Sequence, residues 1–432
     1  MTRAVFFPVV ALALALPAPR AQASVPSTIG AGARSMALAR ADVADAAPLD
    51  AGEQNAASAA EPGVRLRLGY SLAALGLTID ERQAGLDRAS GIELGLQAGW
   101  RVGTEVTVGL ALSGYVPHGH IARVVFRPVS EPQLVRYEAA LARTVFDAVA
   151  AFSFHGLALG GGLTASLDVE GGGTDFELGQ DGGGTRADAA TDIELPYRLA
   201  PLVAARADLG PVKLGARFAG EQGVGLGLRA TAVIALVDNP LDGSTTVRVD
   251  GVSGWQPARL AVGARFDLPA RFAAHVAFEY SMWSAAPAPV ANVDLDVDLR
   301  TSPELRQQRY GEAGFVDTFS PRVGLELEGG HAPGPEDWRW VLRAGYALSP
   351  TPVPPQRGQA SWADATTHVA GAGAALRIGD AAGVDLVAGL GGQLSLLAER
   401  TMEKPNPALP FARYQVGGHI VAGALTLEGT WR

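Results

Sequence analysis

Apolar and polar residues alternate along most of the chain from residue 64 onward. Val64 and Leu66 alternate with Arg65 and Arg67, and 92–101 repeats the pattern. A period of two places successive side chains on opposite faces of a β-strand. The chain is therefore predicted to consist mainly of strands with one apolar face and one polar or small face.

We predict fourteen such strands, most of them 10–14 residues long, a length suited to a tilted strand that crosses a bilayer. Their spans are 64–77, 91–101, 105–115, 144–154, 157–170, 197–208, 211–220, 257–267, 272–283, 319–328, 338–348, 367–378, 384–396 and 419–431.

The connections between these strands alternate in length. Short turns follow most even-numbered strands, and the longer connections are 116–143, 171–195, 221–256, 284–318, 349–366 and 397–418. Short periplasmic turns and long extracellular loops characterise bacterial outer-membrane barrels. An even number of strands places both chain ends on the periplasmic side.

One segment, 226–237, also has the character of a strand. Counting it gives fifteen strands and places a long connection on the side of the short turns. We therefore predict that 226–237 belongs to an external loop.

Aromatic residues lie on the apolar face near the ends of several predicted strands, where they would form interfacial girdles. They are Tyr70, Trp100, Phe266, Tyr280, Trp338, Trp340 and Trp431. A soluble β-sandwich or lipocalin-like barrel would also show alternation, but with its large residues facing inward. The opposite face here is rich in Gly and Ala, which favours a crowded lumen filled by a plug.

The first 23 residues have the organisation of a secretory signal peptide. Arg3 provides a positive charge, 5–16 are apolar, and Ala21-Gln22-Ala23 is a small-residue cleavage site. We predict a signal peptide over 1–23, a plug over 24–62 that is rich in small residues, and a transmembrane barrel over 63–432.

Composition narrows the classes of protein further. The chain has no Cys, which excludes disulfides, and 54 Gly, which disfavours a helical bundle. Its net charge of −9 becomes −11 when Arg3 and Arg20 are removed with the signal peptide. Because the chain has no excess of basic residues, no nucleic-acid partner is expected.

Several stretches resemble the FadL/TodX family of outer-membrane transporters for long-chain fatty acids and other hydrophobic compounds. The similar stretches are 30–39, the Asn55-Ala56-Ala57 triplet, 278–284, 315–326, 342–354 and 367–373. The chain departs from the family in three places. Ala56 replaces the Pro of the family's Asn-Pro-Ala, the chain ends on Arg432 rather than an aromatic residue, and 171–195 is rich in Gly and Asp.

The resemblance implies a fourteen-stranded barrel whose N-terminal residues fold inside it as a hatch, with Gly30, Gly32 and Asn55 in that hatch. It further implies that a hydrophobic ligand such as a long-chain fatty acid enters from outside, binds in the lumen and leaves laterally through the wall. Transport would be passive. We expect a monomer surrounded by outer-membrane lipid, with no cofactor.

The residues themselves suggest where such a ligand would bind. The segment 221–256 is unusually apolar for an exposed loop, and exposed apolar patches often mark binding sites. Its candidate ligand-binding residues are Leu226, Leu228, Val233, Ile234 and Leu236. Arg217 and Arg265, on neighbouring predicted strands, are candidates to bind a carboxylate. Gly109 and Gly114 are candidates for a bend that opens a lateral exit.

Other residue patterns give weaker evidence of function. His118 and His120 lack nearby carboxylates, and the acidic segment 171–195 lacks the spacing of a calcium loop. No residue pattern provides a nucleophile with an oriented base, so neither a metal site nor an enzyme is predicted. Two alternatives to the transporter stay open. They are a barrel that serves as a scaffold for secretion or envelope assembly, and a general porin.

Overall fold

The structure is a computed structural model of the whole chain. It describes residues 30, 32–86, 88–118, 131–137, 144–167, 169–181, 184–194, 197–235, 243–299, 313–330, 338–378 and 383–431. Only the backbone is described at 167, 169–181, 184–194, 197, 224–226, 232–235, 243, 253 and 299.

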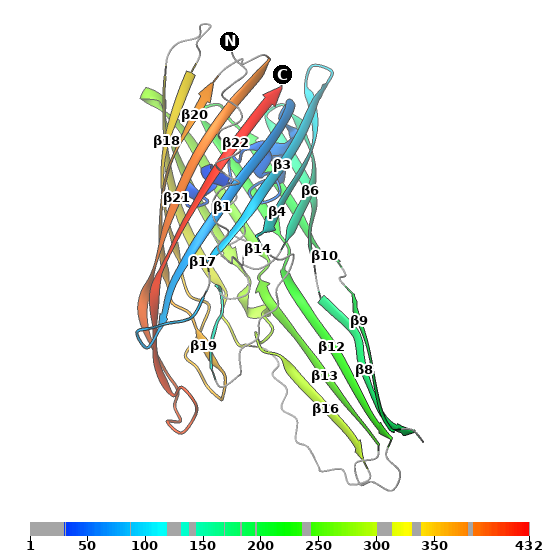
Figure 1. Cartoon of the computed structure of the whole chain (residues 1–432). Coiled ribbons are helices and arrows are strands. Elements are labelled where there is room, and N and C mark those ends of the chain that lie inside the picture. Colours follow the sequence, from blue (N-terminus) through cyan, green and yellow to red (C-terminus); the bar gives the residue numbers. More distant parts are fainter. Residues whose placement is uncertain are drawn as a thin grey trace, which may run out of the picture.

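Fourteen antiparallel strands form a closed barrel (Figure 1). In order around the wall they are β1 (Gly63–Ile79), β3 (Ala89–Val102), β4 (Val106–Pro117), β6 (Val145–Phe154), β7 (Leu157–Leu167), β10 (Tyr197–Asp208), β11 (Val212–Ala219), β14 (Arg259–Leu268), β15 (Phe272–Ser281), β17 (Thr318–Gly330), β18 (Trp338–Ser349), β20 (Thr367–Ile378), β21 (Val384–Glu403) and β22 (Arg413–Trp431). Closure comes from β1, which pairs with both β22 and β3. The two-residue β2 (Arg82–Gln83) pairs with the end of β1.

The predicted fourteen-stranded barrel is confirmed. Short turns such as 103–105 and 155–156 lie at the end of the barrel where β22 finishes, and Gly103 and Gly156 provide the positive φ values that these turns need. In outer-membrane barrels this end faces the periplasm, and we call it the periplasmic end. At the opposite, extracellular end, β21 and β22 extend several residues beyond their predicted limits and pair with each other there.

The outer surface of the wall is apolar. Leu110, Leu199 and Leu390 are 54%, 60% and 61% exposed. Trp100, Trp338 and Trp431 lie on this surface near the periplasmic end, and Phe278 stacks on Phe319 near the extracellular end, with 5.3 Å between ring centroids. A surface of this kind is stable against lipid rather than water. In the part of the chain that the structure describes, no helix is both long and apolar enough to cross a membrane.

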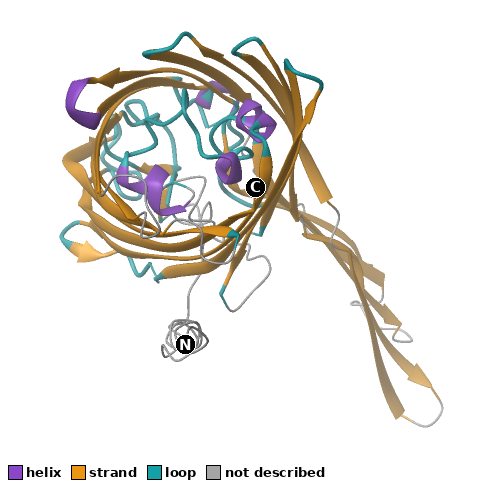
Figure 2. Ribbon diagram, turned by 90° about the horizontal axis from the view of Figure 1, so that it is seen from above, coloured by secondary structure: helices purple, strands orange, loops and turns teal. Residues whose placement is uncertain are grey.

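Five further strands form a separate sheet that projects from the extracellular end (Figures 1 and 2). Their order is β16 (Asn292–Leu299), β13 (Gly243–Gln256), β12 (Gln222–Ala235), β8 (Val169–Asp181) and β9 (Gly184–Glu194). We call this the projecting sheet. The pairing of β8 with β12 is parallel, while the other pairs are antiparallel.

This sheet corrects one prediction. Of the segment 226–237, the described residues 226–235 lie outside the barrel wall, as predicted, but they are a strand within β12 rather than part of a loop. The segments 171–195 and 284–318, expected as long connections, likewise contain strands of this sheet. Within the sheet, β8–β9 and β12–β13 are local pairs, whereas β8–β12 and β13–β16 join connections far apart in the sequence. No local pattern reveals the latter pairings.

The two faces of the projecting sheet differ. Val293 and Leu295 of β16 pair with Val249 and Val247 of β13, so these residues share an apolar face, and Val249 pairs onward with Leu228. The other face of β16 carries Asp294, Asp296 and Asp298. Charges on an edge strand hinder pairing with further strands.

Inside the barrel lie residues 32–62, which we call the inner segment (Figure 2). It contains the helix α3 (Gly32–Ala37) and the 3-10 helices η1 (Pro48–Asp50) and η2 (Ala56–Ala60). Its Ala and Gly residues allow it to approach the wall closely. At Gly109, for example, the backbone of Ala59 occupies the space that a Cβ would need.

The extracellular mouth holds the remaining short elements. They are β5 (Pro132–Leu134), which pairs in parallel with β19 (Ser361–Ala363), and the 3-10 helix η4 (Trp283–Ala285). Another 3-10 helix, η3 (Pro269–Arg271), forms the turn between β14 and β15 at the periplasmic end.

Candidate functional site

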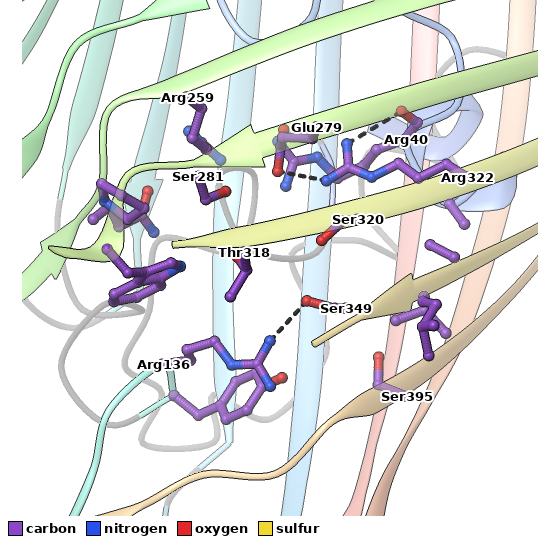
Figure 3. A pocket seen from close by; sticks show the side chains of 18 of the residues that line it. Arg40, Arg136, Arg259, Glu279, Ser281, Thr318, Ser320, Arg322, Ser349 and Ser395 are labelled. Carbon is purple, nitrogen blue, oxygen red and sulfur yellow. Dashed lines mark hydrogen bonds and ion pairs between the residues drawn. The ribbon is translucent and has the colours of Figure 1, made fainter. Parts of the chain in front are cut away.

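A cavity of about 120 Å³ lies between the inner segment and the extracellular mouth. We call it the central cavity, and Figure 3 shows its lining. Hydroxyl groups from four different strands face it, namely those of Ser281, Thr318, Ser320, Ser349 and Ser395. The cavity therefore offers many hydrogen-bond donors along one side of the lumen.

Guanidinium groups surround the floor of the central cavity. Arg40 of the inner segment, Arg259 of β14 and Arg322 of β17 line it together with a single carboxylate, Glu279. Arg322 Nη2 donates to Glu279 Oε1 at 2.6 Å, and Arg40 Nη2 lies 3.6 Å from Glu279 Oε2 (Figure 3). Arg217 of β11 donates to the carbonyl of Glu53 in the inner segment. The positive charges around this floor exceed the negative ones.

Arg136 and Tyr137 close the cavity on the extracellular side. Arg136 Nε donates to Asp364 at 2.9 Å and Nη1 to the Ser349 hydroxyl at 2.7 Å. The Tyr137 hydroxyl lies 3.0 Å from the Thr367 hydroxyl. These contacts hold the segment that follows β5 against the barrel wall, so it forms a roof over the cavity.

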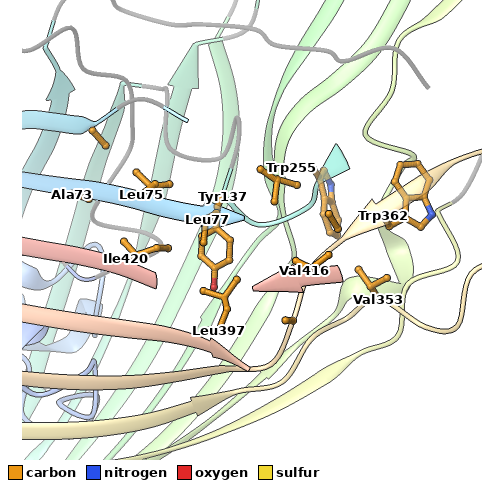
Figure 4. Close-up of a cluster of buried hydrophobic side chains, with 14 of the residues drawn as sticks. Ala73, Leu75, Leu77, Tyr137, Trp255, Val353, Trp362, Leu397, Val416 and Ile420 are labelled. Atoms are coloured by element: carbon orange, nitrogen blue, oxygen red, sulfur yellow. The ribbon is translucent and has the colours of Figure 1, made fainter. Parts of the chain in front are cut away.

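Aromatic side chains from four chain segments meet beside this roof (Figure 4). Ring centroids are 5.7 Å apart for Trp255 and Trp283, 6.2 Å for Trp283 and Phe315, and 5.7 Å for Phe315 and Trp362, all in edge-to-face geometry. Trp255 and Trp283 also line the central cavity. An apolar environment thus adjoins a positively charged one.

Sequence reasoning missed this aromatic cluster because its four members come from segments far apart in the sequence, which meet only in the folded chain. The only signal was that Trp283 and Phe315 fell in stretches of family resemblance. Arg136 was missed as well, since nothing in its local sequence distinguishes it.

The structure separates the two predicted carboxylate-binding arginines. Arg217 lies near the floor of the central cavity. Arg265 lies closer to the periplasmic end, where it contacts Asp45, Asp267 at 2.7 Å and Glu326 at 3.3 Å.

Asp45 is the centre of this second group, which fixes the inner segment to the wall. Its carboxylate contacts Arg34 at 3.0 Å, Lys213 at 2.8 Å and Arg265. Burial opposes ionisation of Asp45, but the three cations outweigh that effect and lower its pKa to about 2.

Of the predicted apolar ligand contacts, Leu228 is 40% exposed on the apolar face of the projecting sheet. The side chains of Leu226, Val233 and Ile234, and all of Leu236, lie outside the described residues. Their contact with ligand stays a prediction.

Of the residues predicted for the hatch, Gly30 precedes α3 with a φ of +133°, and Gly32, the first residue of α3, has a φ of +71°. Asn55 caps η2, because its side chain accepts from the Ala57 amide at 3.0 Å and donates to the Val43 carbonyl at 2.8 Å.

Gly109 and Gly114 lie in hydrogen-bond ladders that run without a register shift on both sides of β4. Neither glycine introduces a break in pairing here, and their part in a lateral exit stays a prediction.

No protein-family model matches the chain, and no curated protein matches it in sequence. Solved structures do match. A Pseudomonas aeruginosa FadL homologue aligns with 95% of this chain and 99% of its own, with a TM-score of 0.53 and 13% identity. The P. putida toluene transporter TodX aligns with 94% of this chain and 99% of its own, with a TM-score of 0.49 and 13% identity. The chain has the fold of the FadL homologue, and its apolar exterior places it in the outer membrane.

Proposed function

We propose that this chain transports hydrophobic molecules with a carboxylate head group, such as long-chain fatty acids, passively across the outer membrane. The observation that carries the proposal is the central cavity, where Arg40, Arg259 and Arg322 lie beside a cluster of Trp and Phe rings. A guanidinium binds a carboxylate in two-point geometry. The rings offer an apolar surface to the acyl chain.

At about 120 Å³ the central cavity is smaller than the 300–1,000 Å³ usual for small-molecule sites. It suits a head group, and the acyl chain would have to pass between the aromatic rings. We therefore expect ligand binding to move the roof that Arg136 and Tyr137 hold.

The apolar face of the projecting sheet provides a first contact for the ligand outside the membrane. Val293 and Leu228 are 49% and 40% exposed there, and exposed apolar surface favours adsorption of hydrophobic molecules. Lateral release at Gly109 and Gly114 would require the β4 ladders to open and stays a prediction.

A general porin fits the lumen less well, because the buried inner segment fills it and ionic contacts fix it to the wall. An assembly scaffold would need neither the buried guanidinium groups nor the adjoining rings.

The test is binding of oleate and of dodecane to the purified, detergent-solubilised chain. For oleate, Arg259→Gln should weaken binding about 10-fold, the equivalent of about 1.4 kcal/mol. Dodecane has no carboxylate, so its binding should change less than about 2-fold. The matched control is Arg339→Gln, which removes an inward-facing arginine of β18 that does not line the central cavity. If the unaltered chain fails to bind oleate, the proposal is wrong.

A further inference from the structure

A second cavity, of about 500 Å³, opens at the periplasmic end of the lumen. We call it the periplasmic cavity. Its lining includes Arg65, Arg101 and Arg377, together with Asp385 and Val387 of β21. Its volume lies within the range usual for small-molecule sites.

The periplasmic cavity is also richer in cations than in anions. Arg377 pairs with Asp385 at 2.8 Å, and Arg65 donates to Gln97 at 2.7 Å. Among the residues that the structure describes, Arg101 has neither a hydrogen-bond partner nor an ion-pair partner. The cavity therefore presents a solvent-accessible guanidinium that suits a carboxylate.

The two cavities lie on the same side of the lumen with α3 between them. Along β21 the inward-facing positions 385 and 387 line the periplasmic cavity, and 393 and 395 line the central cavity. Between them, Gly389 and Gly391 face Ala33 of α3. Neighbouring β20 repeats this order, since Arg377 lines the first cavity, Gly373 and Gly371 face Ala37, and Val369 lines the second. Positions 387 and 393 are six residues apart along the strand, which is roughly 20 Å.

On β20 and β21 the wall beneath α3 consists of Gly371, Gly373, Gly389 and Gly391, which we call the glycine track. A Cβ on Gly371 would lie only 2.5 Å from the Ala37 carbonyl oxygen. The helix thus rests on bare backbone, without side chains from these positions that interlock with it. Its specific attachments are the Gly32 amide, which donates to Glu93 at 2.8 Å, and Arg34, which pairs with Glu326 at 3.0 Å.

We propose that the periplasmic cavity is a second carboxylate-binding site, which the ligand reaches from the central cavity when α3 moves along the glycine track, and from which it leaves directly into the periplasm. Arg101 receives the head group, with Arg65 and Arg377 beside it. This inference rests on the proposed function, because it takes the same ligand class. It differs from lateral release in the direction of exit.

Two features of the wall favour this direction. Both ladders of β4 are continuous, so the wall is closed at the predicted lateral exit. Movement of α3, by contrast, meets no side chain from the glycine track, although it has to release Arg34 from Glu326 and Asp45, and Met36 from its buried position.

A reversible disulfide tests whether α3 must move, and the absence of cysteine makes it specific. A Cβ on Gly389 would lie 3.3 Å from the Ala33 Cβ, close to disulfide geometry. Oxidised Ala33→Cys/Gly389→Cys should slow uptake of labelled oleate by cells at least 10-fold, and a reductant should restore it. The matched control is Val43→Cys/Gly263→Cys, where the same distance is 3.4 Å. It fixes the inner segment away from α3 and should leave uptake within 2-fold. Equal uptake by both oxidised variants would overturn the inference.

Cross-linking with the unaltered chain avoids the risk that the double variant misfolds. Palmitic acid carrying a diazirine, photolysed during transport, should label Val387 and Thr430 of the periplasmic cavity as well as residues of the central cavity. Arg101→Gln should reduce periplasmic-cavity labelling about 5-fold, while Arg271→Gln, in the exposed turn between β14 and β15, should not. Labelling of the central cavity and of 109–114, but not of the periplasmic cavity, would establish lateral release instead. No labelling in the central cavity would overturn the proposed function itself.

Discussion

The barrel wall and the projecting sheet share the same alternation of apolar and polar residues, but the faces that it creates have different surroundings in the two regions. In the wall, the apolar face meets lipid and the other face encloses the inner segment and its ion pairs. In the projecting sheet, Val293 on one face and Asp296 on the other are both exposed, and neither face surrounds anything. A period of two therefore identifies a strand, while closure of the sheet decides what each face contacts.

The sharpest test of this difference places a charge on each apolar face. Leu390→Arg at mid-wall should lower the free energy of unfolding by about 2–4 kcal/mol, because a charge near the centre of the bilayer is poorly solvated. Val293→Arg in the projecting sheet should change it by less than about 0.5 kcal/mol. Urea unfolding in lipid vesicles measures both values. Equal losses would mean that the two faces share one environment.

The next largest contrast should come from removal of one charge that contacts the polar face of the wall and of one charge on the polar face of the projecting sheet. Asp45→Asn leaves Arg34, Lys213 and Arg265 without a shared carboxylate and should cost about 2 kcal/mol. Asp296→Asn, on the exposed edge strand β16, should be neutral within about 0.5 kcal/mol. Hydrogen exchange of the inner segment and of β16 reports each change locally. Unchanged protection at 32–62 in Asp45→Asn would show that these ion pairs do not hold the inner segment.

The pKa of the same carboxylate, Asp45, determines how attachment of the inner segment should depend on pH. Because the pKa of Asp45 is lowered from 3.8 to about 2, its stabilising effect is complete well above pH 4. It should be lost as the pH falls from about 4 to about 2. Amide protection at 32–62, measured relative to the intrinsic exchange rate at each pH, should fall over that interval in the parent chain, and much less in Asp45→Asn. An equal loss of protection in both chains would assign the effect to another group.

The smallest difference between the two regions should come from removal of one hydrogen-bonding side chain in each. Asn55→Ala removes the cap of η2 and should cost about 1 kcal/mol. Thr231→Ala removes a 3.3 Å contact with Thr246 in the projecting sheet and should cost less than about 0.5 kcal/mol. Thermal unfolding compares the two variants. A larger loss for Thr231→Ala would reverse the expected order.

The sequence was sufficient to predict the wall, because each strand in it carries its own alternation and membrane strands need similar lengths. It was insufficient for the projecting sheet as a whole, since β8 and β12 come together only by pairing across more than 50 residues. The same limit applies to the site. Arg217 and Arg265 were identified as inward-facing cations, but local sequence could not show that Arg265 contacts Asp45, which is 220 residues away.

The parallel pair β8–β12 has a consequence for the order of assembly. The chain enters the projecting sheet three separate times, in 169–194, 222–256 and 292–299, and returns to the wall after each excursion. The pairing that joins the first excursion to the second can therefore form only after both have crossed the bilayer. In the chain, the wall strands β10 and β11 lie between these two excursions. Such nonlocal pairing is slow compared with hairpin closure. The projecting sheet should thus mature last, and an antibody specific for the β8–β12 junction would mark barrels whose insertion is complete.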